Sequence, residues 1–239
     1  MRLEAGQVHV WRAELDPVAP EIERRREALS PDERERAARF RVPRVQLRFT
    51  AGRVILRDIL SRYLDCPPSA ISFGYRQHGK PFLLPIPGGE RLRFNLSHSH
   101  GLALYGVSLD AEIGIDLEQV RRDRDHEKLA RRFFAPEETG ALLALPPEQR
   151  LTAFFECWTR KEAYLKARGE GLAIPLDSFE VSLAPGSAAG LLRVADDPGE
   201  TRRWSLVALD PGPGFAAALA VESRPADVRL WQWRAANKG

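Results

Sequence analysis

The segment EIGIDLEQV, residues 112–120, begins a second run of predicted elements that repeats the order of a first run near the N-terminus. Its apolar residues alternate with other residues, which predicts a β-strand. A short helix with a proline near its start and a long helix over 148–168 follow this strand. In the first run, VHVWRAEL (8–15) is typical of a strand, and it precedes SPDERERAARF (30–40) and a long helix over about 45–64.

The two runs are related by a nearly constant shift in residue number. A shift of 105 residues places SPDE (30–33) on APEE (135–138), Val8 and Val10 on Ile113 and Ile115, Phe49 on Phe154, and Arg57 on Glu162. Further strand-like runs follow each long helix. The sequence therefore predicts an α+β fold of two similar halves, residues 1–108 and 109–239, with a binding site at the seam between them.

Composition indicates a soluble globular protein. Of the 239 residues, 44% are hydrophobic and 29% are charged, with a formal net charge of +3. Arginine is abundant between residues 24 and 62, either as solvated helix faces or as an anion-binding surface for phosphate or an acidic protein partner. Cys66 and Cys157 are the only cysteines, which argues against a disulfide framework or a zinc site. Without a signal peptide or an apolar run of membrane-spanning length, we expect a cytoplasmic protein.

Two carboxylates follow one face of the strand in the second half. On a strand, Asp116 and Glu118 point to the same side, while Ile115 and Leu117 occupy the other. Neighbouring carboxylates repel each other and are costly to bury unless a cation lies between them, and Mg²⁺ binds such oxygen ligands. The alternative is an edge strand whose polar face meets water.

The long helix FFECWTRKEAYLKARGEGL (154–172) carries further charge beside its largest aromatic residue. Trp158, Glu162 and Lys166 are spaced four apart and therefore lie on one side of the helix. If this helix packs beside the strand, Glu162 supplies a third carboxylate to a metal site. The alternative is an exposed ion pair between Glu162 and Lys166, although Trp158 indicates that this side is partly covered.

Two loop-proximal motifs offer phosphate-binding groups. NLSHSHG (95–101) places Ser97 and His98 at the end of a predicted strand, before a glycine turn. A Ser–His hydrolase pair is disfavoured, because adjacent strand residues point to opposite faces and no G-x-S-x-G elbow is present. HGKPFLLP (78–85) is either an ordinary exposed turn or one in which Lys80 meets a phosphate.

Together these stretches resemble the 4′-phosphopantetheinyl transferases of the surfactin-synthetase-activating (Sfp) type. The resemblance covers roughly residues 25 to 180, and the combination of GID-x-E with W-x-x-KEA-x-x-K is its most specific part. The matching blocks are SPDERERAARF…LRFTAGRVILR (30–57), GKP (79–81), FNLSHS (94–99), IGIDLE (113–118), RRFFAPEE (131–138) and WTRKEAYLKARGEGLAIPLDSF (158–179).

The resemblance implies a pseudo-dimer of two similar α+β halves that moves the phosphopantetheine arm of coenzyme A onto a serine of an apo carrier protein. The first half would contact coenzyme A and the carrier, and the second would hold Mg²⁺ and the catalytic helix. The implied metal ligands are Asp116, Glu118 and Glu162. The implied coenzyme A contacts are Arg48, Gly79, Lys80, Pro81, Ser97 and His98, with Lys161 and Lys166 beside the pyrophosphate. The implied catalytic residues are Lys166, which would stabilise or protonate the leaving bisphosphate, and Glu138 or Glu162, which would take the serine proton.

Two residues depart from the family pattern by reversing a charge: Glu33 where lysine is frequent, and Glu170 in place of the lysine of G-K-G-L. Because both would lie near an anionic substrate, they bear on the strength of coenzyme A binding. A non-catalytic carrier-protein or nucleotide-binding module on the same scaffold is the main alternative, and an arginine-rich nucleic-acid-binding protein is a weaker one. We expect a monomer, because the two internal halves build the site themselves. We also expect no binding to nucleic acid or membranes.

Overall fold

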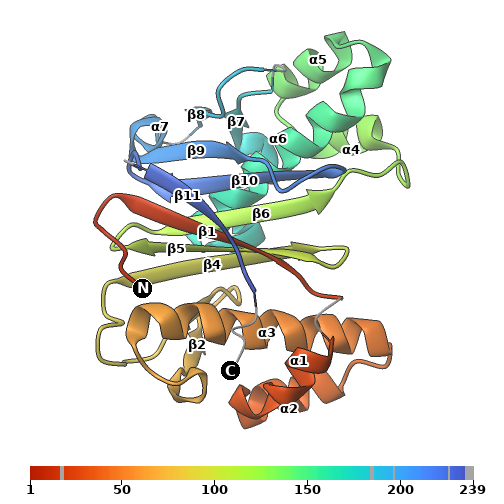
Figure 1. Ribbon diagram of the computed structural model, residues 1–239. Helices are drawn as coiled ribbons and strands as arrows, with labels where there is room; N and C mark the ends of the chain where they lie inside the picture. The colour runs from red at the N-terminus through yellow and green to blue at the C-terminus, as the bar shows by residue number, and fades with distance from the viewer. Residues whose placement is uncertain (17–18, 184–185, 196, 226, 235–239) are drawn as a thin grey trace.

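The first half of the chain forms one layer of strands covered by a long helix. The computed structural model describes residues 1–16, 19–183, 186–195, 197–225 and 227–234 (Figure 1). None of the helices it describes is long and apolar enough to cross a membrane. In chain order, the first half contains β1 (Gln7–Glu14), α1 (Ala19–Arg24), α2 (Pro31–Ala38), α3 (Pro43–Leu64), β2 (Phe73–Tyr75), β3 (Pro81–Leu83), β4 (Leu92–Ser99) and β5 (Leu102–Leu109).

The second half repeats this order with one added helix. It contains β6 (Ile113–Gln119), α4 (His126–Phe133), α5 (Pro136–Ala144), α6 (Pro147–Arg168), β7 (Phe179–Val181), β8 (Leu191–Val194), α7 (Glu200–Arg203), β9 (Trp204–Leu209) and β10 (Phe215–Glu222). The addition is α7, which precedes β9, whereas α4 precedes α5 as α1 precedes α2. The α+β fold class and the pseudo-dimer of two similar halves are therefore confirmed.

Sheet topology shows the repeat most directly. The first sheet runs β1–β5–β4, and the second runs β6–β10–β9, so corresponding strands hold corresponding places. The last strand, β11 (Asp227–Gln232), breaks the symmetry because it pairs in parallel with β1 of the first sheet. The boundary at 108/109 falls at the end of β5 and stays a prediction, and the C-terminal strand crosses back over it.

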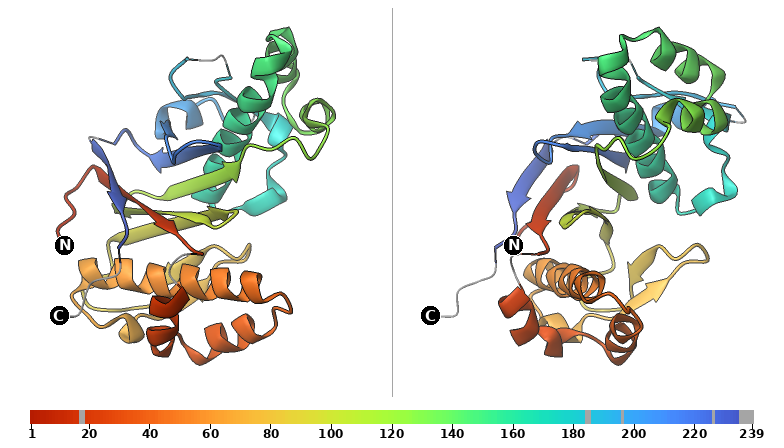
Figure 2. Two further views of the ribbon diagram at one scale, coloured as in Figure 1. Left: turned by 45° about the vertical axis from the view of Figure 1, so that its right-hand side comes forward. Right: turned by 90° about the vertical axis from the view of Figure 1, so that its right-hand side faces the viewer.

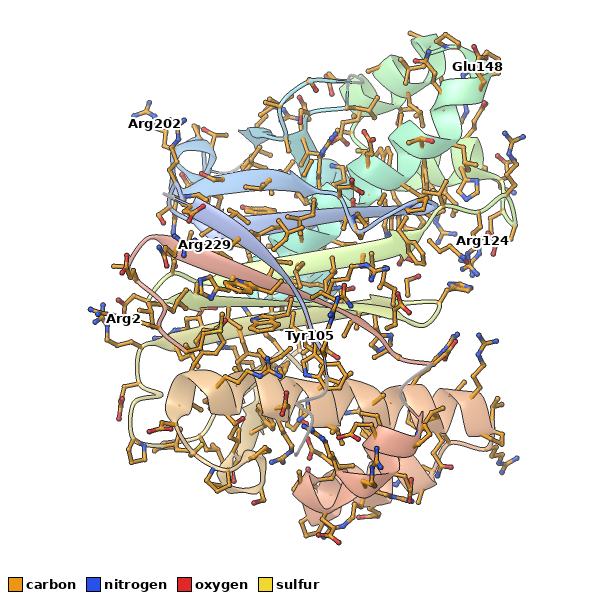
Figure 3. The ribbon with its side chains drawn as sticks, in the orientation of Figure 1. Arg2, Tyr105, Arg124, Glu148, Arg202 and Arg229 are labelled. Atoms are coloured by element: carbon orange, nitrogen blue, oxygen red, sulfur yellow. The ribbon has the colours of Figure 1, made fainter. Side chains whose placement is uncertain are left out.

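Each long helix covers its own sheet, and the strands lie between the two helices (Figures 1 and 2). Under α3, Ile55 and Ile59 are buried with Tyr105 of β5, whose hydroxyl donates to the Gly52 carbonyl at 3.1 Å (Figure 3). Under α6, Ala163 is buried with Ala218 of β10. A third apolar cluster joins the halves, and it contains Val8, Val10, Leu102, Leu104, Ile113, Ile115 and Leu219.

A glycine sets the distance between α6 and the strand beside it. A Cβ atom built on Gly114 of β6 would lie 2.1 Å from the Ala163 carbonyl oxygen and 2.2 Å from the Ala167 nitrogen. Real Cβ contacts are never this short, so only glycine permits the packing. The close approach brings Glu162 and Lys166 of α6 beside the strand that carries Asp116.

The long helices correct one detail of the predicted repeat. Each has 22 residues, but α3 begins at Pro43 and α6 at Pro147, a shift of 104 rather than 105. Arg57 therefore corresponds to Lys161, and the predicted match of Arg57 with Glu162 is wrong by one residue. The shift changes because the connection between the short and long helices is shorter in the second half.

Candidate active site

A cavity of about 630 Å³ lies at the seam, with walls from both halves. The first half supplies cations from α2 and α3, and the second supplies carboxylates from β6 and α6. The charged and imidazole side chains that line it are Arg36, Arg48, Arg53, His98, Asp116, Glu118, Glu162 and Lys166. Gly79, Pro81, Ser97 and Trp158 line the same cavity.

Asp116 is the most buried of the carboxylates in this cavity, with a relative exposure of 4%. Its Oδ1 atom lies 2.6 Å from Nζ of Lys166 and accepts a hydrogen bond from Oγ of Ser97 at 3.0 Å. Its Oδ2 atom is buried and has no hydrogen-bond partner in the part of the chain that the structure describes. Because burying a carboxylate oxygen without a hydrogen-bond partner is energetically costly, this oxygen is suited to bind a cation.

Glu118 and Glu162 are half-buried, and both interact electrostatically with Asp116. Burial, together with repulsion from Asp116, raises the pKa of Glu118 above its ordinary value. The same two causes raise the pKa of Glu162, and Lys166 opposes the shift at both residues. A cluster of mutually repelling carboxylates that gains proton affinity is the environment that a divalent cation relieves.

The chemistry of this donor set fits Mg²⁺, which prefers carboxylate oxygens and retains waters or phosphate oxygens as its remaining ligands. Among the described residues, no group of three or more His, Cys, Asp or Glu side chains is already arranged to hold a metal ion. At Asp116, Oδ1 is engaged by Lys166 and Ser97. The cavity unites the predicted ligands, and their role as ligands stays a proposal.

The opposite wall carries arginines that are already held by other side chains. Arg48 donates through Nε and Nη2 to both oxygens of Asp16, each at 2.7 Å, which fixes its guanidinium at the cavity wall. Arg53 donates to Glu33 at 2.5 Å, and the guanidinium of Arg36 lies over the Phe49 ring at 5.4 Å. Fixed arginines lose little side-chain entropy when they bind phosphate.

The predicted phosphate-binding motifs reach the cavity unequally. Gly79, Pro81, Ser97 and His98 line it. Surrounding protein atoms, with the positive charges of Lys166 and Arg48, lower the pKa of His98.

The Lys80 ammonium is bound by protein acceptors, and its predicted phosphate contact stays a prediction. Its ammonium donates to Oε2 of Glu112 at 2.9 Å and to the carbonyls of Ile113 and Ala167, both at 3.0 Å. An ammonium has three N–H donors, so these acceptors satisfy it. Lys80 ties the β2–β3 turn to β6 and α6, and thereby positions Gly79 and Pro81.

The structure also corrects the predicted roles of Lys161 and Glu138, because neither side chain reaches the cavity. Lys161 is fully buried, with an exposure of 0%, and lies 2.7 Å from Oε2 of Glu138. Its other donors bond the carbonyls of Leu176 and Phe179. Glu138 accepts from the amides of Ala135 and Val181. The pair therefore stabilises the packing of α5, α6 and β7.

The two charge departures have structural explanations. Glu33 is buried, at 2% exposure, and pairs with Arg53 and Arg57, so it does not oppose an anion in the cavity. Glu170 pairs with Arg168 at 2.6 Å. Sequence patterns gave no role to Asn95 of β4, although its alternation with Ser97 and Ser99 placed all three on one face.

Comparisons with known proteins match both halves. Residues 112–220 match the model of the 4′-phosphopantetheinyl transferase superfamily, and residues 13–107 match that of the 4′-phosphopantetheinyl transferase N-terminal region. The chain is 42% identical to the 4′-phosphopantetheinyl transferase HetI of Nostoc sp., over 98% of this chain and 95% of the relative. It is 31% identical to the 4′-phosphopantetheinyl transferase Sfp of Bacillus subtilis, over 88% of this chain and 90% of that protein.

Proposed function

The chain belongs to the 4′-phosphopantetheinyl transferase superfamily, and from this premise we propose that it transfers the 4′-phosphopantetheine arm of coenzyme A to a serine of apo carrier proteins. One observation supports the proposal most strongly. Asp116, Glu118, Glu162 and Lys166 meet in a single cavity, opposite arginines from the other half. A diphosphate needs such a combination of metal-binding oxygens and cations, because its transfer depends on charge neutralisation and positioning.

The proposed metal ligands come from two elements. Asp116 and Glu118 would hold Mg²⁺ from β6, and Glu162 would complete the set from α6. When bound, Mg²⁺ neutralises charge on the diphosphate and polarises the phosphorus that is attacked. The orphaned Oδ2 atom of Asp116 and the repulsion between the carboxylates support this assignment.

The substrate would lie between the arginines and the carboxylates. Arg48 and His98 would contact phosphate groups of coenzyme A, with Ser97 beside them and the Gly79–Pro81 backbone against the rest of the molecule. Lys166 uses two of its three donors on Asp116 and Ser97, so its third N–H can bond an oxygen of the diphosphate.

The proposed reaction is an in-line displacement at phosphorus. The serine hydroxyl of the carrier forms a new P–O bond at the phosphate that bears the pantetheine arm. The bond from this phosphate to the bridging oxygen breaks, and adenosine 3′,5′-bisphosphate leaves with charge that Lys166 stabilises. Glu162 accepts the serine proton as the general base.

The test is direct detection of the modified carrier. Purified protein is mixed with coenzyme A, Mg²⁺ and several apo carriers, and the phosphopantetheine adduct is sought by mass spectrometry. We expect Asp116→Ala to abolish the adduct. Asp110→Ala, which removes an exposed carboxylate paired with Arg91, should leave the rate unchanged. Coenzyme A binding without an adduct on any carrier would instead indicate a non-catalytic binding module.

A further inference from the structure

Three polar side chains of β4 join the two sheets where their backbones do not pair. The amide of Ile115 donates to Oδ1 of Asn95 at 2.9 Å. The amides of Leu117 and Gln119 donate to the hydroxyls of Ser97 at 3.2 Å and Ser99 at 3.1 Å. Alternate side chains of one strand therefore satisfy alternate amides of the other, and we call Asn95, Ser97 and Ser99 the seam ladder.

The repeat shows that this arrangement is particular to one half. In the first sheet, β1 pairs with β5 on one edge and with β11 on the other, through backbone pairing from Gln7↔Asp227 to Arg12↔Gln232. In the second sheet, β6 pairs with β10 on the corresponding edge. Its other edge receives the seam ladder instead of a backbone. Side-chain hydrogen bonds thus replace backbone pairing on β6, the strand that carries Asp116 and Glu118.

Two members of the seam ladder bond a carboxylate as well as an amide. The hydroxyl of Ser97 donates to Oδ1 of Asp116 at 3.0 Å, and that of Ser99 donates to Oε2 of Glu118 at 3.1 Å. Each hydroxyl has one proton to donate, so both donors are committed to the carboxylates while their lone pairs accept the amides. Asn95 contributes only its amide acceptor to this edge.

We propose that Ser97 and Ser99 are positioning residues that couple the seam between the halves to the orientation of the metal-binding carboxylates. The inference rests on the proposed function, since it assigns Asp116 and Glu118 to Mg²⁺. Hydroxyls anchored to the β6 backbone restrict the rotation of each carboxylate and prepare it for the ion. Groups that orient metal ligands in this way typically contribute 10- to 100-fold to metal affinity.

Ser99 gives the cleaner test, because Ser97 also contacts Lys166 and lines the cavity. The probe is Mg²⁺ alone, titrated calorimetrically into full-length protein well below its unfolding temperature. We expect Ser99→Ala to raise the Kd for Mg²⁺ about tenfold. Ser99→Thr keeps the hydroxyl and should restore most of the affinity.

Asn95→Ala is the matched control for damage to the seam, since it removes a member of the ladder that holds no carboxylate. It should lower the unfolding temperature as Ser99→Ala does, while the Kd for Mg²⁺ of the folded protein stays within about twofold of wild type. An unchanged Kd in Ser99→Ala, or an equal loss of affinity in Asn95→Ala, would overturn the inference. Glu118→Ala distinguishes failure of this inference from failure of the proposed metal site. If Glu118→Ala leaves Mg²⁺ binding intact, the assignment of Glu118 to the metal fails.

Discussion

Arg57 of α3 and Lys161 of α6 occupy corresponding places and make corresponding contacts in the two halves. Arg57 pairs with buried Glu33 at 2.7 Å and donates to the carbonyls of Pro68 and Ile71. Lys161 pairs with buried Glu138 at 2.7 Å and donates to the carbonyls of Leu176 and Phe179. In each half, a buried cation thus ties the short helix and the following loop to the long helix.

This equivalence predicts that Lys161 acts in stability rather than in binding coenzyme A. Lys161→Met leaves Glu138 buried without its cation, and we expect it to lower the free energy of unfolding by about 3–5 kcal/mol. The double variant Glu138→Gln/Lys161→Met should recover part of that loss, because no unpaired charge remains. Denaturant titration measures both effects. A tenfold rise in the Kd for coenzyme A, measured on the folded fraction, would instead place Lys161 at the substrate.

The repeat was predictable from sequence because its landmarks are local. Proline at the start of a helix followed by two acidic residues occurs in both α2 and α5, and both glutamates at the third helical position, Glu33 and Glu138, bond back to the amide at the helix start. The family motifs likewise placed Asp116 and Glu162 in one site. Local pattern and motif together were sufficient for the fold and the site's location.

The state of individual charges was not predictable, because it depends on contacts between distant segments. Lys80 lies in a motif typical of phosphate contact, yet its acceptors belong to Glu112, Ile113 and Ala167. Glu33 reads as a charge reversal facing the substrate, yet two arginines of α3 cover it. Spacing along the chain specifies which face of an element a residue occupies, but not which side chain reaches it from another element.

In the first half, the positions that correspond to the carboxylate cluster are covered by aromatic residues. Where Lys166 lies 2.6 Å from Asp116, the corresponding Arg62 lies over the ring of Trp11 at 5.0 Å. Asp58, which corresponds to Glu162, pairs with Arg62 and accepts a hydrogen bond from the Trp233 indole at 2.7 Å. The C-terminal segment therefore covers in one half the position that stays open to the cavity in the other.

The packing of α6 on β6 predicts a large effect from a single methyl group. Gly114→Ala would place a Cβ atom 2.1 Å from the Ala163 carbonyl, so the helix must move away from the strand. We expect a loss of about 3 kcal/mol in the free energy of unfolding, at the upper end for overpacking. Because the shift also separates Lys166 from Asp116, transfer activity should fall in the protein that remains folded.

Gly140→Ala is the control for this substitution, since a Cβ atom on Gly140 of α5 would meet nothing within 4 Å. This change should raise the free energy of unfolding by about 0.5–1 kcal/mol, because alanine is favoured over glycine in a helix. Thermal and denaturant unfolding compare the two variants. Equal stability of Gly114→Ala and wild type would show that α6 does not approach β6 this closely.

Repulsion among the carboxylates predicts that the metal-free protein is more stable without one of them. Glu162 has a raised pKa in the folded protein relative to its ordinary value of 4.5. The folded state therefore binds its proton more tightly than the unfolded chain does. This contribution to stability is complete below pH 4.5 and is lost as the pH rises through the folded pKa. Glu162→Gln should remove the loss and stabilise the metal-free protein at pH 7 by about 0.5–2 kcal/mol.

Mg²⁺ should reverse the order of stability, so that wild type becomes more stable than Glu162→Gln. Wild type gains stability from binding the ion, whereas Glu162→Gln, with one ligand charge fewer, should gain much less. The measurement is the unfolding temperature of both proteins with and without Mg²⁺, from pH 5 to pH 8. Equal stabilisation of both proteins by Mg²⁺ would remove Glu162 from the metal site.

The arginine-rich connection between α2 and α3 predicts where the carrier protein docks. Arg41 is exposed, and it follows Phe40, which lines the cavity. Carrier proteins are generally acidic, so a cation at the cavity mouth would attract them.

We expect Arg41→Glu to raise the KM for the carrier about tenfold, while the KM for coenzyme A stays within about twofold. The reason is that a charge at the rim of an interface acts mainly on the rate at which the two proteins associate. Added salt should shrink the difference, since exposed charges are screened. Arg202→Glu reverses an exposed charge on α7 (Figure 3), a helix that supplies no residue to the lining of this cavity, and should change neither constant. Equal rises in both KM values for Arg41→Glu, or an equal carrier effect from Arg202→Glu, would refute docking at this connection.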